Sequence, residues 1–272
     1  MYDTHMHSSF SYDSSMTLDQ LCQTAIKLGL HGVTVTDHAN LNRFEENALI
    51  RNFKGMIPAF NKARDRYSNN LKLFCGIEIG EYLREPEKAK QILSLTDYDQ
   101  IIAAIHFLDF NNNDITFAAA VFDNQISNEE IYQYISIYFD DLLKTAENFD
   151  FDVLAHITYP LRYINLKYER NIDLGIFENK IRQIYQTIIQ RGIALEVNTS
   201  RFQEKYRFQL TPDEHLLTLY RSMGGERITL GSDAHIPQNI ALGFSQVRKI
   251  LRELGFDRCC YFDKRKIQYF NI

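Results

Sequence analysis

Seven short apolar segments recur along this chain, separated by longer stretches that have the spacing of helices. The segments occupy residues 2–7, 32–37, 71–79, 101–107, 152–156, 193–198 and 228–232. Each is rich in β-branched or aromatic residues and has the length of a strand buried in a parallel sheet. Strands that alternate with helices predict an α/β fold, because parallel strands need helical crossovers. Seven such strands favour closure into a barrel over an open sheet.

Helix start and stop signals separate these segments. A capping box at residues 17–20 precedes an apolar pattern that ends at Gly29, and a second box at residues 127–130 opens a helix that reaches about residue 149. Residues 173–190 have helical spacing and precede Gly192. At residues 211–214, Thr-Pro-Asp-Glu predicts a helix with Thr211 as its cap and Pro212 in its first position. No linker rich in Pro, Gly or Ser interrupts the pattern, so residues 1–272 are expected to form a single domain.

Composition narrows the possible functions. The chain has 30 basic and 35 acidic residues, a net charge of −5, so it lacks the positive surface typical of proteins that bind nucleic acid. We find no run of 18 apolar residues and no leader-like N-terminus, so a cytoplasmic protein without membrane contacts is expected. The four cysteines show no metal-binding spacing and are expected to be reduced core residues.

Polar side chains gather where the predicted strands end. Glu78 and Asp233 have this placement, whereas His31 and His215 do not. Six of the eight histidines also lie at or just past the carboxyl end of a segment: His5, His7, His38, His106, His156 and His235. In β/α barrels the carboxyl ends of the strands face the active site, so these residues are expected to converge.

The spacing and chemistry of these residues favour a metal site. His5 and His7 are two positions apart on an extended segment, as are Asp233 and His235, so each pair leaves one face of its strand. Imidazole and carboxylate ligands without thiolate suit zinc, manganese or iron. A single histidine at a strand end is more often a core or surface residue, but six at one end of the fold predict a site for several metal ions. For Asp13, in a loop, spacing alone leaves both a turn role and a ligand role open.

The motifs that carry these residues resemble those of the PHP (polymerase and histidinol phosphatase) family of metal-dependent phosphoesterases. They are His5-x-His7, Thr36-Asp37-His38, Gly76-Ile-Glu78-Ile-Gly80-Glu81, Ala104-Ile-His106-Phe107, Leu154-Ala-His156 and Gly231-Ser-Asp233-Ala-His235, in the family's order. The resemblance implies a distorted seven-stranded β/α barrel that holds two or three divalent metal ions at the carboxyl ends of its strands. Residues 76–81 and 231–237, with Gly243-Phe244 and the chain length, resemble the histidinol-phosphate phosphatase branch.

The resemblance also implies three sets of ligands. One ion would be held by His5, His7, Glu78 and Asp233. A second would share Glu78 and use His106 and His156. A third would take His38, His235 and Asp13, at a position where some relatives carry histidine.

The activity implied by the resemblance is hydrolysis of L-histidinol phosphate to L-histidinol and phosphate, in histidine biosynthesis. A hydroxide that bridges two metal ions would attack the phosphorus, and Asp233 would orient it or take its proton. Arg162 and Arg201 follow predicted strands and are candidates for substrate binding, because a guanidinium bonds two phosphoryl oxygens at once. The expected partner is a small phosphorylated substrate, and the expected oligomeric state is a monomer.

Other functions stay open at this point. The main alternative is a PHP phosphoesterase for nucleotides or other small phosphomonoesters. A phosphotyrosine-protein phosphatase and an amide hydrolase on a similar barrel are further options. A binding module with purely structural metals would be marked by missing ligands, whereas here the set is complete. Residues 258–272 are expected to form a closing strand and a solvated turn, without an assigned function.

Overall fold

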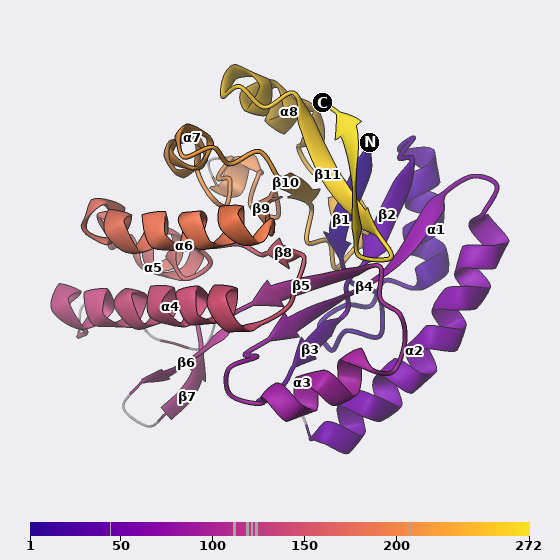
Figure 1. The fold of residues 1–272 in the computed structure, drawn as a ribbon, viewed down its shortest axis with the longest axis horizontal. Helices are drawn as coiled ribbons and strands as arrows, with labels where there is room; N and C mark the ends of the chain where they lie inside the picture. The colour runs from indigo at the N-terminus through magenta and orange to yellow at the C-terminus, as the bar shows by residue number, and fades with distance from the viewer. Residues whose placement is uncertain (44, 111–112, 118–119, 121, 123–124, 207) are drawn as a thin grey trace.

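Seven parallel strands form the centre of the computed structural model (Figure 1). The structure describes all residues except 44, 111–112, 118–119, 121, 123–124 and 207. The strands lie in the order β1 (Tyr2–Met6), β2 (Gly32–Val35), β4 (Lys72–Gly80), β5 (Gln100–Ala104), β8 (Val153–Leu154), β9 (Ala194–Asn198) and β10 (Ile228–Gly231). The Asp233 N–H donates to the His5 carbonyl and the His7 N–H to the Ala234 carbonyl, which joins the last strand end to the first. The predicted α/β barrel of seven strands, nearly closed, is confirmed.

Helices surround the strands on the outer face of the barrel (Figure 1). They are α1 (Leu18–Lys27), α2 (Glu46–Tyr67), α3 (Pro86–Leu93), α4 (Asn128–Asn148), α5 (Leu161–Tyr168), α6 (Glu178–Arg191), α7 (Glu214–Ser222) and α8 (Phe244–Glu253). Within the described part of the chain, no helix combines the length and the apolar composition that a membrane span requires.

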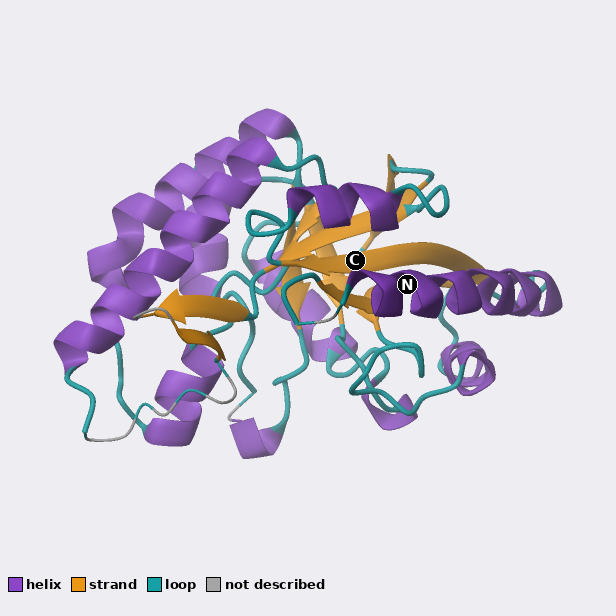
Figure 2. Cartoon of the chain, turned by 90° about the horizontal axis from the view of Figure 1, so that it is seen from below, coloured by secondary structure: helices purple, strands orange, loops and turns teal. Residues whose placement is uncertain are grey.

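Two short additions lie near the carboxyl ends of the strands. β3 (His38–Asn40) pairs with β4, with His38 opposite Glu78. β6 (Phe107–Phe110) and β7 (Asn113–Thr116) form an antiparallel hairpin that projects from the barrel (Figure 2).

The two predicted capping boxes are confirmed. The side chains of Thr17 and Ser127 accept the backbone N–H groups of Gln20 and Glu130, whose side chains reach back to the cap residues. Because the cap residue and its partner are three positions apart, local sequence is enough to specify the start of α1 and of α4.

Two other predicted helix starts are wrong. Thr211 does not cap α7, because its backbone forms an antiparallel bridge with Asn198 of β9; Asp213 is the cap instead, and Pro212 precedes it. The pattern at 173–190 is not one helix. It opens with a 3-10 turn (Leu174–Phe177) because the Asp173 side chain accepts the Gly175 N–H, and α6 follows.

The C-terminal residues differ from the single closing strand expected for 258–272. β11 (Arg258–Asp263) and β12 (Lys266–Asn271) form an antiparallel hairpin across the amino ends of the barrel strands. Cys260 and Phe262 pack on Ile102, Val153 and Ala194 from the barrel interior. The hairpin therefore closes the end of the barrel opposite the predicted site. Its two cysteines, like Cys22 and Cys75, are free and buried, as predicted.

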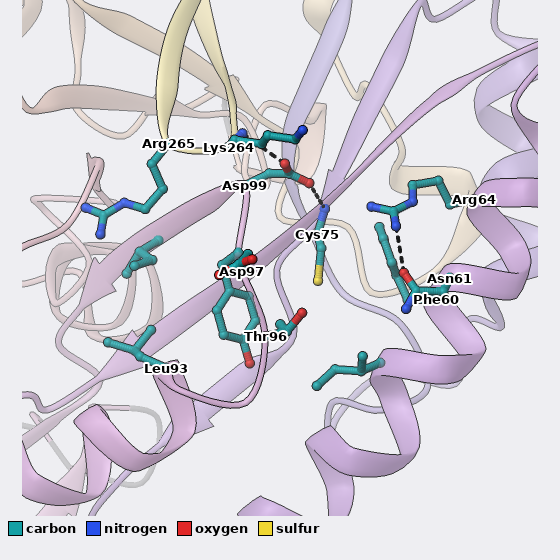
Figure 3. Close-up of a pocket in the computed structure, with 13 residues that line it drawn as sticks. Phe60, Asn61, Arg64, Cys75, Leu93, Thr96, Asp97, Asp99, Lys264 and Arg265 are labelled. Carbon is teal, nitrogen blue, oxygen red and sulfur yellow. Dashed lines mark hydrogen bonds between the residues drawn. The ribbon is translucent and has the colours of Figure 1, made fainter.

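The turn of this hairpin is exposed at Asp263 and Lys264, as expected, and it is also anchored to the barrel. Asp99 accepts the backbone N–H of Cys75 at 2.8 Å and that of Lys264 at 2.9 Å (Figure 3). The cavity drawn there, about 780 Å³, lies between α2, the residues before β5 and the hairpin turn. Its lining includes Arg64, which donates to Asn61, and none of the predicted site residues. The cavity thus belongs to the seam between the hairpin and the barrel.

We predict that Asp99→Asn lowers the free energy of unfolding by about 1–3 kcal/mol, because the amide cannot accept both backbone N–H groups and leaves a buried donor unpaired. Urea unfolding followed by circular dichroism measures the change. The matched control is Asp97→Asn, at an exposed neighbouring position, which should change the free energy of unfolding by less than about 0.5 kcal/mol. Equal effects of the two variants would contradict the anchoring role of Asp99.

Candidate metal centre

The predicted ligands meet around Glu78, whose side chain comes from the end of β4 and is fully buried. Its two carboxylate oxygens face histidines from four strand ends. The distances are 2.7 Å to His38 Nδ1, 3.0 Å to His156 Nε2, 3.4 Å to His106 Nε2, 3.5 Å to His5 Nε2 and 3.6 Å to His7 Nε2. Glu78 Oε2 nevertheless accepts no hydrogen bond from any described group. A buried oxygen with many nitrogens nearby and no proton donor aimed at it suits a bound cation.

Asp233 and Asp13 complete the cluster on its open side. Asp233 Oδ1 lies 3.3 Å from His7 Nε2. Asp13, whose role the spacing left open, lies 3.5 Å from His38 Nε2 and 3.4 Å from His235 Nε2. All nine predicted ligands are therefore brought together.

Among the described residues, three groups have possible ligand atoms within 4.8 Å of one another: His5, His7 and Asp233; His38, Glu78 and His106; and His7, His38 and His235. The first group belongs to one set implied by the resemblance. The other two mix members of different sets, because His38 lies between Glu78 and Asp13.

Three of the histidines are oriented by partners on their second ring nitrogen. His5 Nδ1 lies 2.5 Å from Glu196, His7 Nδ1 lies 3.1 Å from Ser11 Oγ, and His106 Nδ1 lies 3.2 Å from the Asn40 side-chain oxygen. Histidines that bind metals usually donate their other N–H in this way, which fixes the ring and leaves Nε2 free.

Opposing effects set the charge of the cluster without metal. Burial alone would lower the pKa of His38, but the carboxylates of Glu78 and Asp13 outweigh it and raise that pKa to about 10. Burial works to raise the pKa of Glu78 and of Asp233, yet the surrounding histidines hold both pKa values well below the usual range. The carboxylates of Glu78 and Asp233 therefore stay ionised without metal. The proton on His38 occupies a position that a metal cation can take.

The backbone is strained at this end of the barrel. His156 and Asp233 have positive φ angles of 27° and 51°, in a region that side chains other than glycine rarely adopt. Such strain persists only where the surroundings hold it in place, and it is common at functional sites. Here the His156 N–H donates to Glu196 and the Asp233 N–H to the His5 carbonyl.

The two predicted substrate-binding arginines line one cavity of about 650 Å³ next to the cluster. Arg162 is 8% exposed; its Nη2 donates to Ser200 Oγ at 3.0 Å, and its Nη1 lies 3.8 Å from Asp233 Oδ2. Arg201 stacks on Tyr206 instead, with 4.2 Å between the guanidinium carbon and the ring centre. The structure thus places Arg162 beside Asp233 and Arg201 at another part of the cavity wall.

Sequence reasoning missed Glu196, a fully buried acid in the middle of β9. Its signal was a single carboxylate within the otherwise apolar segment 193–197, and its partner His5 lies at the other end of the chain.

We predict that metal binding by the metal-free protein releases protons at pH 7, because His38 must lose a proton before its ring nitrogen can bind an ion. The apparent Zn²⁺ affinity should therefore rise as the pH rises from about 6 to 8. A pH indicator in weakly buffered solution measures the release, and His38→Asn should release fewer protons. Zn²⁺ binding without any release would contradict this charge state.

Comparison with known proteins identifies the family. A model of the PHP domain matches residues 3–200. A probable histidinol-phosphatase of Clostridium acetobutylicum is 26% identical over 273 residues, 99% of each chain. The histidinol-phosphatase of Lactococcus lactis subsp. lactis is 26% identical over 271 residues, 97% of this chain and 95% of the relative. A crystal structure of histidinol phosphate phosphatase from the same organism, complexed with zinc, L-histidinol and phosphate, has a TM-score of 0.76 at 23% identity and covers 98% of both chains. This chain belongs to the PHP domain family.

Proposed function

We propose that this protein is a metal-dependent phosphomonoesterase that hydrolyses L-histidinol phosphate to L-histidinol and phosphate. The observation that carries the proposal is the ring of buried imidazoles around Glu78, with Arg162 beside it. Relatives named histidinol-phosphatase or probable histidinol-phosphatase, which match nearly the whole chain, support this choice of substrate.

The donor set fits two or three divalent ions such as Zn²⁺, Mn²⁺ or Fe²⁺, since it offers nitrogen and carboxylate oxygen and no thiolate. We propose nine residues as their ligands: His5, His7, Asp13, His38, Glu78, His106, His156, Asp233 and His235. When bound, such ions polarise phosphoryl oxygens and lower the pKa of a coordinated water to near neutrality. Glu78, which faces five histidines, is the residue best placed to serve more than one ion.

Asp233 is the proposed catalytic residue. One of its oxygens faces His7 and the other faces Arg162, so the carboxylate stands between the metal ligands and the proposed substrate cavity. Because its pKa is held well below the usual range, it is ionised at neutral pH and can orient the attacking water or accept its proton.

Arg162 is the proposed phosphate-binding residue. Its guanidinium stacks on Tyr159 at 4.6 Å from the ring centre and donates to Ser200, so the planar fork is held before a substrate arrives. Preorganisation of this kind reduces the entropy lost on binding. Arg201, on another part of the cavity wall, is the second proposed substrate-binding residue.

The cavity is also consistent with one alternative. Tyr163 and Tyr206 line it together with Lys205, and tyrosine rings can stack on a nucleobase. A small mononucleotide is therefore the second candidate substrate. In either case we propose a monomer that acts in the cytoplasm as a single domain over residues 1–272.

The test is phosphate release from L-histidinol phosphate, a 5′-mononucleotide and p-nitrophenyl phosphate, by protein of known metal content with and without added Mn²⁺. We expect the highest kcat/KM for L-histidinol phosphate. A higher kcat/KM for the nucleotide would make the nucleotide the substrate in place of L-histidinol phosphate. The proposed metal-dependent reaction would be unaffected by that result. No turnover by protein with bound metal would contradict the proposed activity.

We predict that Glu78→Gln lowers kcat/KM at least about 100-fold and reduces the bound metal, because even residues that only orient metal ligands contribute 10–100-fold to affinity or activity. Metal analysis and the same phosphate assay measure both effects. The matched control, Glu87→Gln on exposed α3 surface, should resemble the unaltered protein. Full metal content and turnover in Glu78→Gln would contradict the site.

Replacing Arg162 by Lys should raise KM or lower kcat so that kcat/KM falls about 10–100-fold, because a charge-assisted hydrogen bond contributes about 1.5–3 kcal/mol. Metal content should stay unchanged, since Arg162 offers no ligand. Arg191→Lys, at the end of α6 and far from the cluster in the fold, is the control. An unchanged kcat/KM for Arg162→Lys would exclude bidentate phosphate binding by this residue.

A further inference from the structure

β9 lies between β8 and β10 in the barrel, and none of the nine proposed ligands lies on it. It nevertheless carries two buried polar side chains: Glu196 is 0% exposed and Asn198 is 1% exposed. A buried carboxylate costs free energy unless its oxygens are well paired. The partners of Glu196 therefore indicate what this residue is there to do.

Glu196 binds groups from both neighbouring parts of the cluster. One oxygen lies 2.5 Å from His5 Nδ1. The other accepts the backbone N–H of His156 at 2.8 Å and the Asn198 side-chain N–H at 3.2 Å. A single carboxylate thus fixes the ring of one proposed ligand and the strained backbone of another.

Asn198 extends the network toward the substrate cavity. Its side-chain N–H is 3.3 Å from Asp233 Oδ2, and its oxygen accepts from the Ser200 backbone N–H and hydroxyl. The Ser200 hydroxyl in turn accepts from Arg162. Hydrogen bonds therefore connect His5 to the proposed catalytic and phosphate-binding residues.

Gly231 gives independent evidence that space is kept for this network. A Cβ at Gly231 would lie 2.4 Å from Glu196 Oε1 and 2.7 Å from the His5 Cβ. Any side chain at this place on β10 would displace the pair. The barrel thus omits a side chain where Glu196 meets His5.

We infer that Glu196 is a positioning residue, which accepts the Nδ1–H of His5 so that Nε2 faces the metal ions, and which sets Asp233 and Arg162 through Asn198. This inference rests on the proposed metal centre. The carboxylate makes no approach to substrate itself, and it acts through His5 and Asn198. Because three N–H donors converge on it, an amide in its place would leave at least one of them without an acceptor.

The test compares Zn²⁺ dissociation constants of Glu196→Ala, Glu196→Asp and the unaltered full chain, measured by competition with a chelator. Visible absorption of the Co²⁺ forms reports the ligand geometry. We expect Glu196→Ala to bind Zn²⁺ about 10–100-fold more weakly, with altered Co²⁺ bands. Glu196→Asp keeps the charge but draws the carboxylate back from His5, so it should also bind more weakly.

Asp99→Asn is the matched control. Asp99 is likewise a buried carboxylate that accepts two backbone N–H groups, but at the other end of the barrel. The Asp99→Asn variant should have a lower free energy of unfolding, but its Zn²⁺ affinity should stay within about twofold of that of the unaltered protein, because distant sites act independently. A metal effect that merely followed stability would appear in this control as well, and would overturn the inference.

The outcomes separate the two proposals. If the unaltered protein binds no Zn²⁺, Mn²⁺ or Co²⁺, the proposed metal centre fails. If the unaltered protein binds Zn²⁺ and both Glu196 variants bind it equally well, the positioning role alone fails. Should Glu196→Ala not fold by circular dichroism, Glu196→Asp decides, with unchanged affinity and Co²⁺ bands overturning the inference.

Discussion

A carboxylate enclosed in protein needs positive charge close by, and Glu78 imposes this requirement on the whole barrel. Five histidines from four strand ends face its two oxygens. Without metal, protonation of His38 supplies part of the balance, as the raised pKa of that residue shows. The cluster therefore needs cations of some kind in order to exist, and the nitrogen and oxygen donors make divalent metal ions the natural occupants.

The barrel supplies the rigidity that such a cluster requires. The proposed ligands stand at or near the ends of strands that are hydrogen-bonded side by side, and the contact of Asp233 with His5 joins the first strand to the last. Behind the ligands stands a second layer of polar groups, including Ser11, Asn40 and Glu196, that binds the nitrogens facing away from the centre. These hydrogen bonds hold the ring orientations, and Glu196 also holds the strained backbone of His156, so the proposed function would depend on residues that do not approach the substrate.

Features encoded within a few residues were predictable from sequence. The capping residues Thr17 and Ser127 and the strand-end positions of the histidines needed only local pattern and the general rule for parallel barrels. Features that depend on distant partners were not. Thr211 does not cap α7 as predicted, because its backbone forms a β-bridge with Asn198. Glu196 looked like an isolated acid because its partner His5 is 191 positions away.

The order of the strands has a consequence for synthesis. Strand β1 pairs with β2, which follows it closely in the sequence. Its backbone contact on the other side comes from residues that follow β10, and the β11–β12 hairpin lies later still in the sequence. Chains emerge from the ribosome N-terminus first. His5 and His7 therefore lack their neighbour Asp233 until more than 220 further residues have been translated. Assembly of the complete proposed metal centre is therefore confined by topology to chains translated at least through His235.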